Sequence, residues 1–542
     1  MRAPARGRER VRGSATRAKE RARLSVRLPR MALALAALAG VAALAFGAGM
    51  PRCGHDESSA PGQAPERTIA EENALPGDAG WRIDRPALNG EIQAYTGQVS
   101  VERGDMLDVY VSTRRDGATY DLDVYRMGWY GGAGGRKVQS VTGLAGENQG
   151  RWDPLRGLQD CRACTLDAST LLIEANWKRS LRLPVRDDWT SGYYVLRFHE
   201  RQSDTAAYAI VVVRDDASRA PLLVQASTNT WQAYNTWGDA SLYGSFGADR
   251  KYVPKTRRAY RVSYDRPYDP TINNSHNDGA GEFFSWEYDF VRWAESRGYE
   301  MSYTTNVDVS LRPATLRQHR LFVSLGHDEY WTAQERDAVE AARDAGVNVA
   351  FFGGNEAYWQ GRLEASSAGV AARVLTVYKD ANLDPVARER ADETTVRFSD
   401  APVNRPESML SGLAYGSNAV PDYQPWRAAS TDHWAFEHTG IAAGESFPGI
   451  VGYEYDHMAP ADQRPAGLAV LGSSAVSGYL GSDTAATTMY SAASGARVFA
   501  AGTIAWSWGL DDFGHEDRGT FADDRLRRLT ANIIDRLGAP PP

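Results

Sequence analysis

Alternating and continuous runs of apolar residues divide the chain into two regions with different expected folds. Between residues 81 and 215, short runs alternate apolar and polar positions, at 106–112, 120–126, 193–198 and 208–213. Turn residues, with no helical stretches, separate these runs, which is typical of an all-β protein. We interpret residues 81–215 as an Ig-like β-sandwich domain.

After residue 216 the pattern changes, because strands now alternate with helices. A polar turn follows the first apolar run, and several later runs have helical apolar spacing. This alternation predicts a parallel, doubly wound sheet. The expected strands are 222–226, 299–303, 321–326, 347–352 and 496–504, and the expected helices are 283–297, 314–318, 332–346 and 525–537.

Polar residues follow two consecutive strands of this second region. His327, Asp328 and Glu329 come directly after one strand, and Asn355 and Glu356 follow the next. Since open α/β sheets bind ligands at the carboxyl ends of their strands, we expect the functional site there. Spacing alone leaves two interpretations of the first group open. It supplies catalytic or metal-binding groups, or it satisfies amides at the start of the next helix.

Length and charge narrow the class of protein. A chain of 542 residues is too long for one hydrophobic core, so we expect two or more domains. Residues 1–30 carry eleven Lys/Arg and two Asp/Glu, a charge of 11 − 2 = +9, and the remainder therefore carries −7 − 9 = −16. An acidic body argues against nucleic acid as a partner.

The basic start of the chain predicts export. It leads into an uncharged apolar stretch over residues 31–50, the pattern of a signal peptide. The stretch is also nearly long enough for an uncleaved membrane anchor. We assign residues 1–50 to this signal or anchor and residues 51–80, rich in Pro, Ser, Gly and Glu, to a disordered linker. The body is then exported, or anchored to the cytoplasmic membrane and exposed outside it.

Cysteine usage and missing motifs exclude several chemistries. Cys161 and Cys164 are more easily explained by a local disulfide than by zinc, which needs about four ligands. No cysteine follows Cys164, so cysteine catalysis is excluded in the second region. The sequence also lacks the Gly-x-Ser-x-Gly elbow, the His-Glu-x-x-His zinc motif and phosphate-binding glycine loops.

Several short motifs together resemble the C-terminal domain of the N,N-dimethylformamidase large subunit. They are Thr230-Trp-Gln-Ala-Tyr-Asn235, Ser263-Tyr-Asp-Arg-Pro-Tyr268, Gly326-His-Asp-Glu-Tyr-Trp331, Gly353-Gly-Asn-Glu-Ala-Tyr-Trp359, Gly452-Tyr-Glu-Tyr-Asp456 and Gly502-Thr-Ile-Ala-Trp506. The preceding β-rich part, with Val124-Tyr-Arg-Met-Gly-Trp-Tyr-Gly-Gly132, is similar to a domain found in uncharacterised bacterial members. The resemblance implies a glutamine-amidotransferase-like α/β domain over residues 216–540, without the amidotransferase cysteine.

The resemblance also implies a site. The family enzyme holds one ferric iron with two tyrosinates and one glutamate, which by motif correspond to Tyr234, to Tyr264 or Tyr268, and to Glu329. Such hard anionic oxygens suit ferric iron. The catalytic residues implied are His327, Asn355, Lys379 and Glu454.

We therefore expect a metal-dependent hydrolase of a small amide or a related C–N bond. The alternative is a non-catalytic envelope protein that binds a glycan or peptide in an aromatic cleft. A zinc hydrolase using His327 and Glu329 ranks last, because a third ligand is not evident. A small subunit accompanies the family enzyme, and the sequence leaves the partner and the oligomeric state open.

Overall fold

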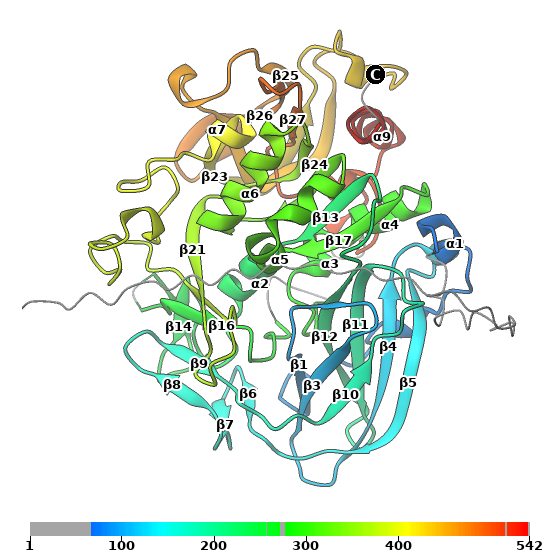
Figure 1. Ribbon diagram of the computed structural model, residues 1–542, viewed down its shortest axis with the longest axis vertical. Helices are drawn as coiled ribbons and strands as arrows, with labels where there is room; N and C mark the ends of the chain where they lie inside the picture. Colours follow the sequence, from blue (N-terminus) through cyan, green and yellow to red (C-terminus); the bar gives the residue numbers. More distant parts are fainter. Residues whose placement is uncertain (1–66, 256, 272–276, 515–517, 540–542) are drawn as a thin grey trace, which may run out of the picture. The chain divides into compact units, whose positions relative to one another are not determined.

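The structure, a computed structural model, describes residues 67–255, 257–271, 277–514 and 518–539 (Figure 1). The expected signal or anchor at 1–50 and the first part of the expected linker lie outside the described residues. Within the described part, no helix is long and apolar enough to span a membrane. The segment Gln63–Pro542 is one compact unit that contains both predicted regions.

The first region contains two β-sheets that share a core. The smaller sheet has the order β1 (Ile92–Thr96), β3 (Met106–Thr113), β10 (Leu181–Pro184). The larger has the order β2 (Ser100–Glu102), β12 (Thr205–Arg214), β11 (Gly192–Glu200), β4 (Thr119–Met127), β5 (Gly135–Ala145). Val109 and Val111 of the small sheet share one apolar cluster with Leu122 and Leu196 of the large one. The all-β prediction is confirmed, whereas the Ig-like topology stays a prediction.

The second region is built on a sheet of nine described strands. Their order is β17 (Met301–Thr305), β13 (Leu222–Ala226), β18 (Leu321–His327), β20 (Asn348–Gly354), β27 (Arg497–Ala500), β26 (Gly481–Ser491), β24 (Ser446–Met458), β23 (Leu413–Arg427), β25 (Ala469–Gly478). The first five strands are mutually parallel. Numbered along the chain, their order is 2-1-3-4-5, which places the topological switch point between β13 and β18.

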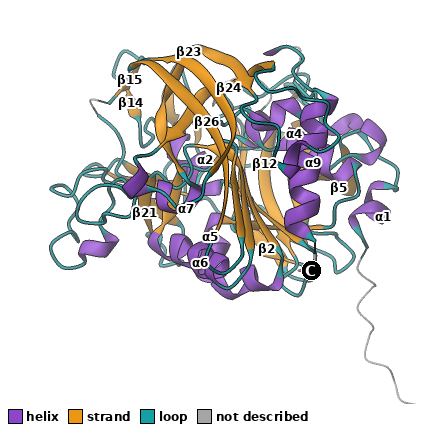
Figure 2. Cartoon of the chain, turned by 90° about the horizontal axis from the view of Figure 1, so that it is seen from above, coloured by secondary structure: helices purple, strands orange, loops and turns teal. Residues whose placement is uncertain are grey.

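Helices pack on both faces of the parallel strands, as Figure 2 shows. On one face, α4 (Tyr288–Ser296) and α9 (Asp524–Gly538) join the apolar cluster of Val224, Leu325 and Phe352. On the other face, α6 (Ala333–Asp344) packs on Phe322 and Phe351, next to α5 (Asn306–Leu311). The doubly wound prediction is therefore confirmed. The specific likeness to a glutamine amidotransferase stays a prediction.

Two segments differ from their sequence-based prediction. The stretch after β13, predicted as a polar turn, is helix α2 (Thr228–Tyr234), whose polar residues are buried and bonded to other segments. Within the expected linker, α1 (Ile69–Asn73) begins at a capping box of Thr68 and Glu71 and buries Glu72. Since Glu72 pairs with Arg136 of β5, this segment is tied to the sandwich.

Smaller elements connect the two regions. A four-stranded sheet has the order β16 (Arg261–Ser263), β22 (Val374–Thr376), β21 (Trp359–Glu364), β19 (Tyr330–Thr332). Three hairpins and two short helices complete the described strands and α-helices: β6 (Arg151–Asp153) with β7 (Gly157–Gln159), β8 (Thr165–Asp167) with β9 (Leu172–Glu174), β14 (Gly244–Phe246) with β15 (Tyr252–Pro254), α3 (Phe283–Trp286) and α7 (Ser408–Ser411). The expected helix 314–318 is part of a 3-10 helix, Pro313–Gln318.

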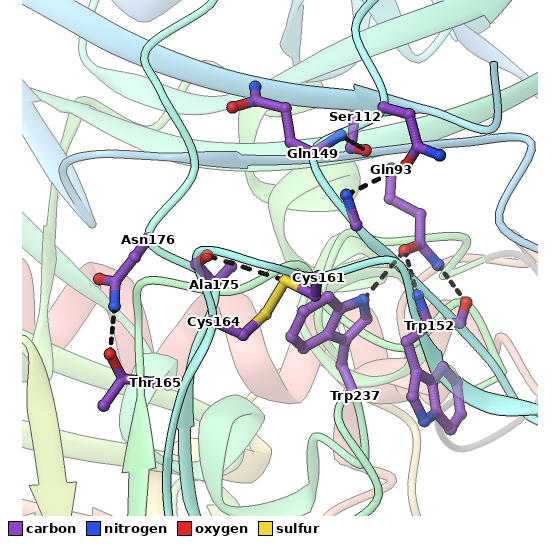
Figure 3. Close-up of a disulfide and its surroundings, with 12 residues drawn as sticks. Gln93, Ser112, Gln149, Trp152, Cys161, Cys164, Thr165, Ala175, Asn176 and Trp237 are labelled. Carbon is purple, nitrogen blue, oxygen red and sulfur yellow. Dashed lines mark hydrogen bonds between the residues drawn. A yellow bond between two sulfur atoms is a disulfide. The ribbon is translucent and has the colours of Figure 1, made fainter. Parts of the chain in front are cut away.

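Cys161 and Cys164 form a disulfide beside a group of buried tryptophans (Figure 3). Gln93 of β1 organises this group, because its amide donates to the Trp152 carbonyl and its Oε1 accepts from Trp237 Nε1 at 3.1 Å. Trp237 lies three residues after α2. The sandwich thus anchors the segment that follows the first strand–helix unit of the α/β region.

Candidate functional site

The candidate site lies at the carboxyl ends of β13 and β18, at the switch point of the parallel sheet. Tyr234 is the last residue of α2, which follows β13, and His327 is the last residue of β18. Glycine is required at 326, because its φ is +62° and a Cβ there would lie 2.5 Å from the Trp286 Cβ. Directly after β18, Glu329 lies beside α2, fixed by a 3.0 Å bond from its amide to Thr230 Oγ1.

Two phenols converge on the Glu329 carboxylate. The Tyr234 hydroxyl lies 3.0 Å from Glu329 Oε2, and the Tyr243 hydroxyl lies 2.5 Å from Oε1 and 2.6 Å from Oε2. The two tyrosine rings stack with centroids 4.4 Å apart. Hard oxygen donors from three side chains, each on a separate chain segment, therefore meet at one point.

Tyr243 is not among the residues predicted from sequence. It lies in the loop between α2 and β14, where no periodicity distinguishes it from other loop tyrosines. Its neighbours Ala240 and Leu242 are buried in a small apolar cluster, which turns the phenol toward Glu329.

Tyr264 and Tyr268, the expected positions of the second tyrosine, are placed elsewhere. The Tyr264 hydroxyl donates to Asn229 Oδ1, and its amide is bound to the Arg373 carbonyl next to β22. Both tyrosines line a cavity of ≈ 20 Å³ that does not include Glu329. Among the described residues, no hydrogen bond joins either of them to Glu329. The pairing of β16 with β22 fixes this loop on the side of α2 that carries Asn229.

His327 sits among three carboxylates. Its Nε2 lies 3.0 Å from Glu454 and 3.5 Å from Glu329, and its Nδ1 lies 3.5 Å from Glu282. Burial by itself would lower the pKa of His327, but the Glu454 carboxylate and the contacts with Glu282 and Glu329 raise the pKa well above its usual value. Glu282 is a second residue that the sequence did not single out, because it lies on a loop ahead of α3.

The other predicted polar residues also gather here. Asn355, which follows β20, donates from its side-chain amide to Glu454 Oε2 at 2.8 Å. Lys379 Nζ lies 3.7 Å from the centre of the Tyr243 ring and 4.6 Å from that of Trp359. Burial lowers the pKa of Lys379 to about 7, although the Glu329 carboxylate acts in the opposite direction.

The electrostatics of the oxygen cluster favour a cation. Burial raises the pKa values of the Tyr234 and Tyr243 phenols well above the usual range, and the Glu329 charge raises them further. Burial also opposes ionisation of Glu329, but His327, Lys379 and Tyr243 lower the pKa of that carboxyl. Two phenols beside an anionic carboxylate ionise together only if positive charge is added between them.

Within the described ranges, no group of three or more His, Cys, Asp or Glu side chains could hold a metal ion. The cluster at Glu329 has a different composition, since two of its three donor side chains are phenols. Its donor set fits a hard, highly charged ion such as ferric iron better than zinc, which favours nitrogen and sulfur.

Fold and site together define an α/β protein with a buried cluster of phenol and carboxylate oxygens at the switch point of its sheet. A family model described as N,N-dimethylformamidase beta subunit-like, C-terminal, matches residues 121–520, and the chain belongs to this family. The match begins inside β4, so it covers most of the larger sandwich sheet as well as the α/β region. At the level of reaction class, the family indicates an amide hydrolase. No curated protein matches the chain.

Proposed function

We propose that the protein is an iron-dependent hydrolase of a small amide or a related C–N bond. Tyr234, Tyr243 and Glu329 would hold one ferric ion through their oxygens. The observation that carries this proposal is the convergence of two phenol oxygens on one carboxylate within 3.0 Å. When bound, the iron supplies Lewis acidity, which polarises a carbonyl or lowers the pKa of water.

The surrounding side chains supply the proton transfers. Glu454 is held by Asn355 and by His327, and its carboxylate accepts the proton that the attacking water loses. His327, in contact with Glu454 through Nε2, donates its own proton to the departing nitrogen and takes the proton from Glu454 in its place. Lys379, buried against Tyr243, places positive charge where the amide oxygen becomes anionic.

We further propose that the enzyme acts outside the cytoplasm, on the strength of the basic and apolar pattern of residues 1–50. The same pattern allows contact of the N-terminus with the membrane. The substrate is then a small amide that reaches the envelope or the cell exterior.

The experiment is elemental mass spectrometry on the purified full-length chain grown with iron. We expect one iron per chain in the parent protein and in Tyr268→Phe, and its loss in Glu329→Gln and Tyr243→Phe. The parent should hydrolyse at least one simple amide, and the iron-free variants should lose that activity by ~10³-fold or more.

Comparing Tyr243→Phe with Tyr268→Phe tests which tyrosine is the second iron ligand. If Tyr268→Phe loses iron and Tyr243→Phe keeps it, the assignment of the second tyrosine is wrong. If the folded parent contains no metal at all, the hydrolase proposal fails, and a non-catalytic role in binding a glycan or peptide becomes the better hypothesis.

A further inference from the structure

Two cavities flank one tryptophan at the junction of the sandwich and the α/β region. The larger, ≈ 570 Å³, is lined by Trp81, Arg82, Trp129, Arg292, Asp511 and Phe513 among others. The smaller, ≈ 430 Å³, is lined by Trp293, Arg297 and Arg528, and shares Trp129, Asp511 and Arg527 with the first. Neither cavity contains a residue of the Glu329 site. Trp129 therefore stands between two hollows that the proposed hydrolase chemistry does not use.

The turn that carries Trp129 is built to hold it in place. The amides of Trp129 and Tyr130 both donate to Asn73 Oδ1, at 2.8 and 3.0 Å. Tyr130 has a φ of +47°, a conformation that costs free energy in a non-glycine residue. Gly131 and Gly132 continue the turn with positive φ. The second half of the 124–132 motif therefore holds Trp129 in a fixed position.

This support keeps an indole ring partly exposed to solvent. Arg292 lies over the Trp129 ring at 5.2 Å and is fixed by a 2.9 Å bond to Asp511. The ring is otherwise only partly covered. The packing of the core does not explain why a strained turn holds the Trp129 ring at the surface. Partly exposed tryptophans bordered by hollows are typical of ligand contacts.

The charges around the smaller cavity leave cations in excess. Asp511 is paired with Arg292, and Asp524 is paired with Arg527 at 2.8 Å. The exposed side chains of Arg297 and Arg528 make neither a hydrogen bond nor an ion pair within the described residues. Since guanidinium groups bind carboxylates through two parallel hydrogen bonds, this cavity suits an anionic ligand.

We propose that Trp129 and the two cavities form a binding site for an acidic saccharide chain. A sugar ring stacks its C–H face on the side of the Trp129 indole opposite Arg292, and a uronate carboxylate is bound by Arg297 and Arg528. The larger cavity, lined by four aspartates and three arginines, accommodates a neighbouring sugar unit through hydrogen bonds to its hydroxyl groups. This site is independent of the proposed hydrolase site, and it would bring the enzyme to an acidic polymer.

The test is calorimetric titration of the full-length chain with a hexamer of galacturonic acid, beside the neutral hexamer of glucose. We expect the acidic hexamer to bind, with Kd raised about tenfold in Trp129→Ala. The double variant Arg297→Gln/Arg528→Gln should raise Kd about fivefold. The matched double variant Arg317→Gln/Arg320→Gln removes two exposed charges elsewhere and should leave Kd unchanged.

Several results would overturn the proposal. One is that the parent chain, shown to be folded by its thermal unfolding, does not bind the galacturonic acid hexamer. Another is equal binding of the neutral hexamer, and a third is equal loss of binding in the two double variants, which indicates non-specific attraction. Binding of hexaglutamate at the same residues, with no binding of the saccharide, would assign the site to a peptide. Iron content in Trp129→Ala should equal that of the parent, so this test and the hydrolase test fail separately.

Discussion

Two buried ionic clusters in this protein are built in opposite ways. At the junction of the two regions, Arg126 donates to both Glu295 oxygens at 2.8 and 2.9 Å, and Arg136 pairs with Glu72. Each of these two carboxylates, Glu295 and Glu72, has an arginine. At the strand ends, His327 lies among three carboxylates, those of Glu282, Glu329 and Glu454. A second cation near them is Lys379, whose pKa burial lowers to about 7.

The difference distinguishes a charge pair that stabilises the fold from a cluster that could bind a ligand. A matched buried pair satisfies its own hydrogen bonds, so removing one partner leaves a desolvated charge without compensation. A cluster with surplus carboxylates is costly in the protein alone, because like charges repel each other more strongly in a buried site than in water. The surplus becomes favourable when a cation or a substrate supplies the missing positive charge. The excess of carboxylates over cations, more than burial, therefore distinguishes the candidate site around His327.

The largest expected effect comes from breaking the matched cluster. Arg126→Met leaves the fully buried Glu295 without its partner, and we expect a loss of ~3–5 kcal/mol in the free energy of unfolding. Urea unfolding followed by circular dichroism measures it. The control is Arg85→Met, which removes an exposed pair with Asp204 and should not move the unfolding midpoint. Equal effects of the two variants would show that the Arg126 pair contributes no more than a surface pair does.

The second largest effect is the pH dependence of stability that we expect from Glu287, a carboxyl near the junction whose described hydrogen-bond donors are all neutral. Burial raises the pKa of Glu287 from its ordinary value of 4.5 to about 8, although Tyr193 and Ser227 donate to it. The folded state therefore keeps a proton that the unfolded state releases, and stability falls as pH rises from about 4.5 to about 8. Between about pH 6 and pH 8 the loss should be on the order of 1–3 kcal/mol.

Comparison with Glu287→Gln isolates this contribution, because the amide does not ionise. Urea unfolding at about pH 6 and about pH 8 should give a smaller difference for the variant than for the parent. If both proteins lose the same stability over that interval, other buried carboxyls, such as Asp456, carry the pH dependence.

Much of the fold could be predicted because its parallel strands are apolar and its helices begin at clear signals. The run 222–226 coincides with β13, which is buried along its whole length. The helix expected from Thr332 is α6, which begins at a capping box of Thr332 and Glu335. The antiparallel strands beyond β27 are harder to predict. The pairing of β23 with β24 contains three register shifts, which interrupt the alternation that a strand prediction needs.

The spacing of apolar and polar residues predicted the candidate site only where it follows the sheet, and the family resemblance added Tyr234, Lys379 and Glu454. His327, Glu329 and Asn355 lie at or directly after strand ends, so the position of the strands revealed them. Tyr243 and Glu282 come from loops and reach the site through tertiary packing, which no local pattern encodes. The same reason explains why Tyr264 and Tyr268, with a better motif, lie in a separate cavity.

The smallest expected effect tests the cluster of three carboxylates around His327 directly. In metal-free protein, Glu454→Gln removes one of three carboxylates around His327, while the new amide oxygen can still accept from Asn355. We expect a gain of about 1 kcal/mol in the free energy of unfolding, because like charges no longer repel in a buried site. Urea unfolding in the presence of a chelator measures this gain. A loss of ~2 kcal/mol or more would mean that His327 and Glu454 form a matched pair, and the contrast with the Arg126 cluster would then disappear.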